Sequence, residues 1–141
     1  MLETEPQIVE AYVKTGRAKL VFRHILDFSR SQAASEAAEC AGAQGRFWAM
    51  HHILYEKQGE WASAGDMSQT FIGYAASLGL DTAAFGQCYD SHQFAEKVRA
   101  DDAAAKAAGI RTRPTFDVNG RRVEGALPFA QFRRVIDAAL E

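Results

Sequence analysis

The apolar positions of this chain recur mostly at helical spacing, and only short runs are typical of strands. A first helix is predicted from about Glu5 to Thr15, because apolar residues recur at this spacing and Pro6 suits a first helical turn. The following residues, 18–26, are rich in Leu, Val, Phe and Ile, which favour strands. The pattern therefore predicts helix and then strand at the start of the chain.

A block of helices follows, separated by glycines and by residues that suit helix N-caps. The predicted helices cover residues 31–43, 46–57, 68–78, 82–89 and 92–108, with Asp81 and Ser91 as the caps of the last two. Residues 59–66, which contain Trp61, are interpreted as a loop. A final helix opens at Pro128 and places its apolar residues on one face.

The segment between the last two helices carries the most specific local signals. Gly109 ends a helix, and Pro114 stands at the mouth of a short predicted strand, Thr115 to Val118. Proline cannot donate to a sheet ladder, so it belongs at the first position of such a strand, and a cis bond before it costs little. Asn119-Gly120 then predicts a tight hairpin turn, with residues 121–124 as the returning strand.

Composition excludes several classes of function. The chain has 141 residues, of which 48% are hydrophobic and 24% charged, as in ordinary globular proteins. A net charge of −2 without a basic stripe argues against general nucleic-acid binding. No apolar run is long enough for a membrane span, and the first residues lack the basic and apolar regions of a signal peptide. We also find no zinc-ligand spacing, phosphate loop or Ser–His–Asp signature.

The order of elements and several motifs resemble the DsbA-like thiol–disulfide oxidoreductases. The motifs are the proline loop and hairpin of residues 109–124, the Val123-Glu124-Gly125-Ala126 run, and the stretches at 31–41, 44–48 and 85–88. The resemblance implies an α/β fold: a thioredoxin-like core from residues 1–26 and 109–141, interrupted by an inserted helical domain at 27–108. It also implies N-terminal truncation, because the family's first strand and Cys-x-x-Cys pair match no residues here.

The family exchanges disulfides with protein substrates through a thiolate at a helix N-terminus. This chain has no Cys-x-x-Cys, so it is expected to be inactive as given, with its catalytic residues unknown. The resemblance implies protein or peptide thiols and disulfides as partners, no cofactor, no metal, and an extracytoplasmic location. It also implies substrate binding at Thr112, Arg113 and Pro114. Arg113 departs from the small or β-branched residue usual there, and is either a ligand for an acidic group or a solvated surface arginine.

Cys40 and Cys88 lie too far apart in the sequence to form the usual redox pair. They are either free, buried, small hydrophobic residues or, as in some DsbA-like proteins that this chain resembles, a structural disulfide between two helices of the insertion. Neither stands at a predicted helix N-terminus, where a reactive thiolate would be expected.

Two other functions stay open at this point. One is a non-catalytic thioredoxin-fold module that binds a peptide or partner across the Pro114 loop. The other is a relative of the kappa-class glutathione transferases and 2-hydroxychromene-2-carboxylate isomerases. In any of these cases the apolar strand predicted at 18–26 needs a neighbour, so we expect either a homodimer or direct pairing of this strand with Thr115 to Val118.

Overall fold

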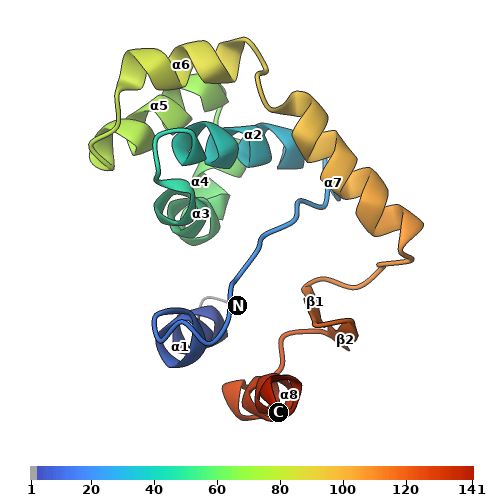
Figure 1. The fold of residues 1–141 in the computed structure, drawn as a ribbon. Helices are drawn as coiled ribbons and strands as arrows, with labels where there is room; N and C mark the ends of the chain where they lie inside the picture. Colours follow the sequence, from blue (N-terminus) through green and yellow to red (C-terminus); the bar gives the residue numbers. More distant parts are fainter. Residues whose placement is uncertain (1–2) are drawn as a thin grey trace. The chain divides into compact units, whose positions relative to one another are not determined.

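The computed structural model describes residues 3–141 (Figure 1). The chain divides into two compact units. One is formed by the chain up to Phe22 together with Lys106–Glu141, and the other by Arg23–Ala105. The family resemblance predicted the two boundaries between these units at residues 26/27 and 108/109.

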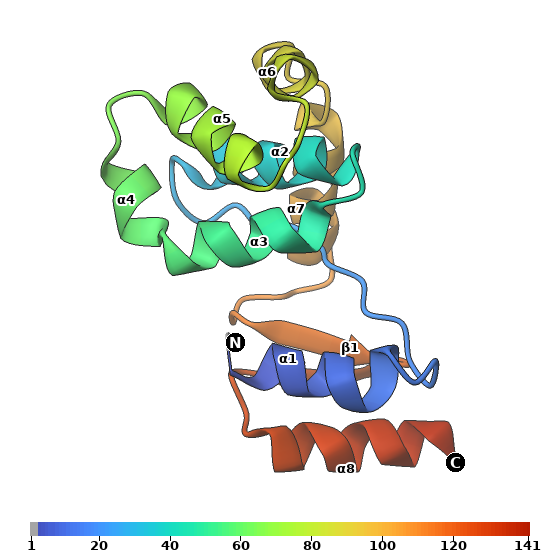
Figure 2. The same ribbon diagram turned by 90° about the vertical axis from the view of Figure 1, so that its left-hand side faces the viewer.

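The first unit packs two helical segments against a hairpin. Helix α1 (Thr4–Ile8) continues into a π-helical turn, η1 (Val9–Val13), and helix α8 (Phe129–Leu140) lies alongside it (Figure 2). The buried core is small and joins all three parts: Ile8, Tyr12, Val123, Phe132 and Ile136. The rings of Phe116 and Phe132 meet edge to face with centroids 4.5 Å apart, which ties the hairpin to α8.

The hairpin consists of β1 (Thr115–Val118) and β2 (Arg121–Glu124), paired antiparallel as predicted. Asn119 and Gly120 both have positive φ, at 50° and 88°, which is the backbone twist that a two-residue hairpin turn requires. The register pairs Thr115 with Glu124 and Val118 with Arg121. The peptide bond between Arg113 and Pro114, just before β1, is cis.

The second unit is helical. Its core contains large, fully buried side chains at Met50, Phe71 and Phe85, together with the cysteines and a row of alanines that allow the helices to approach closely. The Asp81 carboxylate accepts a hydrogen bond from the Ala84 amide at 2.9 Å, so the predicted cap is confirmed. The helices are α2 (Ser31–Gly42), α3 (Phe47–Glu56), α4 (Gln58–Ser63), α5 (Met67–Ser77), α6 (Thr82–Asp90) and α7 (Ala95–Ala107), the last of which runs into the first unit.

The prediction of a strand at residues 18–26 was wrong. This stretch has no regular secondary structure and does not pair with β1, because the described residues contain only the two strands of the hairpin. Near the end of this stretch, two backbone amides bond to carboxylates and not to a neighbouring strand. Asp102 accepts a hydrogen bond from the Leu26 amide at 2.9 Å, and Asp101 accepts one from the His24 amide at 3.3 Å. The stretch is apolar but not buried throughout, since Val21 is 54% exposed.

Two helix boundaries differ from the prediction as well. Residues 59–66 are not all loop, because α4 reaches Ser63. Burial of Trp61 accounts for this helix: the ring is 3% exposed and its indole N–H donates to the Leu54 carbonyl at 2.7 Å, which outweighs the poor helix propensity of Gly59. Helix α7 begins at Ala95 rather than at His92, which has φ of 53° and interrupts the helix.

Candidate functional site

The Pro114 loop leads from the end of α7 into β1. Gly109 ends α7 with a positive φ of 70°, and the loop then presents Thr112 and Arg113 on the surface. The Thr115 hydroxyl donates to the Thr112 carbonyl, and the Gly125 amide donates to the Pro114 carbonyl at 2.8 Å. The loop is therefore fixed at both sides of the proline by bonds to the hairpin.

The hydrogen bond from the Gly125 amide to the Pro114 carbonyl shows which backbone groups of β1 face away from β2. In an antiparallel pair, directly opposed residues are alternately hydrogen-bonded and non-hydrogen-bonded. Because Gly125 donates to Pro114, the register makes Thr115 and Asp117 members of the non-hydrogen-bonded set. Their N–H and C=O groups point outward, and no other strand in the described part of the chain occupies that edge. This edge, next to the proline loop, can accept a further strand.

The charged residues around this loop have distinct roles. The Asp117 carboxylate accepts a hydrogen bond from the Gly120 amide at 2.6 Å and so stabilises the hairpin turn. The Arg122 guanidinium donates to the Ala108 carbonyl at 2.8 Å, just after the C-terminal end of α7. Arg111 and Arg113 are exposed beside the loop.

Cys40 and Cys88 belong to the helical unit, whereas Pro114 belongs to the first unit. They lie in α2 and α6 of the helical unit and form a disulfide with their Cα atoms 5.9 Å apart. Their residues are 1% and 7% exposed. A sulfur bonded to another and buried in this way offers no thiolate, so the pair is structural.

Two of the four histidines, His24 and His92, lie beside glutamate carboxylates. The His24 ring, 3% exposed, lies 2.7 Å from Glu39, and Lys97 donates to the same carboxylate at 2.8 Å. Burial by itself raises the pKa of Glu39, but these two hydrogen bonds outweigh it and hold the pKa below its ordinary value. Sequence reasoning missed this network, because helical spacing does not reveal that His24 meets α2. Residues 3–141 contain no group of three or more side chains placed to hold a metal.

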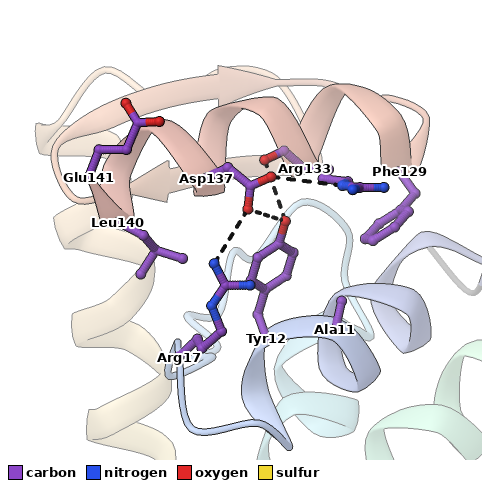
Figure 3. A pocket seen from close by; sticks show the side chains of 8 residues that line it. All are labelled: Ala11, Tyr12, Arg17, Phe129, Arg133, Asp137, Leu140 and Glu141. Carbon is purple, nitrogen blue, oxygen red and sulfur yellow. Dashed lines mark hydrogen bonds and ion pairs between the residues drawn. The ribbon is translucent and has the colours of Figure 1, made fainter.

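A cavity of about 540 Å³ between η1 and α8 was also missed (Figure 3). The Asp137 carboxylate connects the polar residues that line the cavity. The Tyr12 hydroxyl donates to this carboxylate at 2.7 Å, and the guanidinium groups of Arg17 and Arg133 each lie 3.8 Å from it. Burial and then the hydrogen bond to Asp137 raise the pKa of Tyr12, so the phenol keeps its proton. The polar groups at this cavity bind one another and fasten α8 to η1.

Comparison with known proteins decides the family. The thioredoxin family model matches residues 1–138 of the chain. Two solved structures have the same fold: alpha-DsbA1 of Wolbachia pipientis, with a TM-score of 0.81, and oxidised BdbD of Bacillus subtilis, with 0.83. The chain belongs to the DsbA-like thioredoxin family. This chain is 22% identical in sequence to each of the two. The match to alpha-DsbA1 covers 97% of this chain and the match to BdbD covers 96%, and each match covers 75% of the solved chain.

Curated relatives of this DsbA-like chain carry a different name. The chain is 35% identical over 127 residues to Na(+)/H(+) antiporter NhaA 1 of Salinispora arenicola, and 34% identical over 121 residues to NhaA of Herminiimonas arsenicoxydans. These matches cover 88% and 86% of the chain but only 19% of each relative. The chain thus spans about a fifth of the length of these curated relatives. No helix within residues 3–141 is long and apolar enough to cross a membrane.

Proposed function

We propose that this DsbA-like chain is the substrate-binding and structural part of a thiol–disulfide oxidoreductase, and that disulfide exchange also needs a Cys-x-x-Cys segment that this sequence does not contain. The observation that carries the proposal is the open edge of β1. Thr115 and Asp117 direct backbone donors and acceptors outward, beside a proline loop that is fixed to the hairpin. A strand followed by the redox cysteines at the start of a helix would pair there and bring a thiolate to the Pro114 loop.

Binding of the protein substrate is proposed at Thr112, Arg113 and Pro114. Thr112 and Arg113 are exposed, so an extended peptide can reach the backbone of the loop. The cation of Arg113 would favour a thiolate over a thiol in its vicinity and so lower the pKa of a nearby cysteine. Reaction would then follow the usual course: the thiolate attacks a substrate disulfide, a mixed disulfide forms, and a second thiol resolves it.

The chain alone is expected to be inactive in this chemistry, because its own cysteines form a buried disulfide. Reduction of insulin by the 141-residue chain with dithiothreitol should proceed no faster than with dithiothreitol alone. The Cys40→Ser and Cys88→Ser variants serve as controls and should behave identically. Turnover by the chain that either substitution abolishes would place the reactive thiol in the helical unit and refute the assignment.

A second candidate is a non-catalytic module that binds a peptide or partner. The relatives named as Na(+)/H(+) antiporters favour it, since proteins not named for disulfide exchange contain a region 34–35% identical to this chain. The two candidates differ in one measurable respect. A binding module would hold a peptide at the Pro114 loop whether or not thiols are present. An oxidoreductase supplied with a Cys-x-x-Cys segment whose second cysteine is replaced by serine would instead trap its substrate as a mixed disulfide.

A further inference from the structure

A second groove lies on the first unit, between β2 and α8, on the side of the hairpin away from the free edge of β1. Its volume is about 460 Å³. The lining combines apolar residues with an excess of positive charge: Arg121, Arg122, Arg134, Glu124, Val123 and Val135. Neither the family resemblance nor the proposed disulfide exchange makes use of this surface.

The outer edge of β2 faces this groove with unpaired backbone groups. The register that turns Thr115 and Asp117 outward on β1 does the same for their partners, Arg122 and Glu124. Their N–H and C=O groups therefore point away from β1. Within residues 3–141 the sheet has only two strands, so no strand covers this edge. An exposed edge of this kind can take an added strand from a partner.

Charge decides which partner fits. Arg121 and Arg134 are exposed at the groove, whereas Arg122 is engaged with the Ala108 carbonyl, at 2.8 Å. The lining carries three arginines and one glutamate, and a second copy of the chain would bring the same excess of positive charge to the groove, which disfavours it as the occupant. A segment with carboxylates would neutralise the arginines, and an apolar side chain two residues further along the added strand would reach Val123, which shares the face of Arg121.

We propose that the outer edge of β2 is a docking site for an extended acidic peptide, which adds as an antiparallel strand. Its carboxylates lie at Arg121 and Arg134, its apolar residues contact Val123, and its backbone bonds to Arg122 and Glu124. Antiparallel addition continues the direction of pairing of the hairpin and forms the more stable ladder.

The test uses a short fluorescein-labelled peptide of repeating Glu-Thr-Val-Thr, titrated with the full chain at low salt and followed by fluorescence anisotropy. Its Glu and Val side chains share one face, and the Thr amides face β2 in the proposed register. Arg121→Glu and Arg134→Glu should each weaken binding by about tenfold, since each replaces an attraction by a repulsion. Arg99→Glu is the matched control: it makes the same charge change on an exposed residue of α7 and should leave affinity unchanged.

Peptide N-methylation separates strand addition from simple charge attraction. Methyl groups on the Thr amides should abolish binding, whereas methyl groups on the Glu and Val amides should preserve it. Circular dichroism verifies that each arginine variant remains folded. The proposal is overturned if the two methylated peptides bind equally, if Arg99→Glu weakens binding as much as Arg134→Glu, or if the peptide fails to bind while light scattering shows a dimer that Arg121→Glu dissociates. In the last case a second copy occupies the edge.

Discussion

Replacement of both cysteines by alanine should destabilise the helical unit by about 4 kcal/mol. The disulfide joins α2 to α6 across a sequence separation of 48 residues. In the chain-entropy model, closing a loop of this length lowers the conformational entropy of the unfolded chain, which stabilises the folded state by about 4 kcal/mol. Burial of Cys40, which is 1% exposed, adds a further small cost when its sulfur is removed.

Urea unfolding followed by tryptophan fluorescence measures this change. Both tryptophans, Trp48 and Trp61, lie in the helical unit, so the signal reports on the unit that contains the disulfide. With a slope of about 2 kcal/mol per molar urea, a loss of about 4 kcal/mol lowers the midpoint by about 2 M. Dithiothreitol should shift the midpoint of the native chain by the same amount and leave the Cys40→Ala/Cys88→Ala variant unaffected. Unfolding of the double variant at the midpoint of the oxidised chain would show that the disulfide does not stabilise the helical unit.

Two further predictions concern the cores and the buried charges. Phe132→Ala should lower the free energy of unfolding by about 3–5 kcal/mol, because Phe132 is 1% exposed and its ring packs on Phe116. Hydrogen exchange measures this change as a loss of protection of the β1 and β2 amides. Unchanged protection would contradict the packing. Glu39 has a pKa held below its ordinary value of 4.5, so the stability that it contributes is fully present above that pH and is lost as the pH falls through its folded value. Glu39→Gln should therefore lower the urea midpoint at neutral pH and flatten its decline below about pH 4.5, while Glu10→Gln, at the exposed ion pair with Lys14, should do neither.

Signals that act locally could be interpreted correctly from the sequence. Asn119-Gly120 has few alternatives to a tight turn, Asp81 caps the helix that follows it, and Pro128 opens the last helix. The order of the predicted elements, together with the proline loop and hairpin motifs, indicated the DsbA-like fold, which the family match and the solved structures confirm.

Features that depend on distant partners could not be predicted in the same way. The run at 18–26 has strand composition, but a strand forms only beside another strand, and the amides of His24 and Leu26 instead bond to carboxylates of α7. The helix around Trp61 exists because the core buries that ring. The bridge between Cys40 and Cys88 was one of two alternatives, because spacing alone does not tell whether two sulfurs meet.

We propose that this DsbA-like chain exchanges disulfides only together with a segment that pairs with the open edge of β1 and supplies a Cys-x-x-Cys pair. Joining the initial strand and Cys-x-x-Cys helix start of a DsbA-like protein ahead of Glu5 tests it most directly, by the rate of insulin reduction. We predict turnover that disappears when the two added cysteines become serine and that survives Cys40→Ala/Cys88→Ala. A folded fusion with no turnover, or turnover that depends on Cys40 and Cys88, would contradict the account.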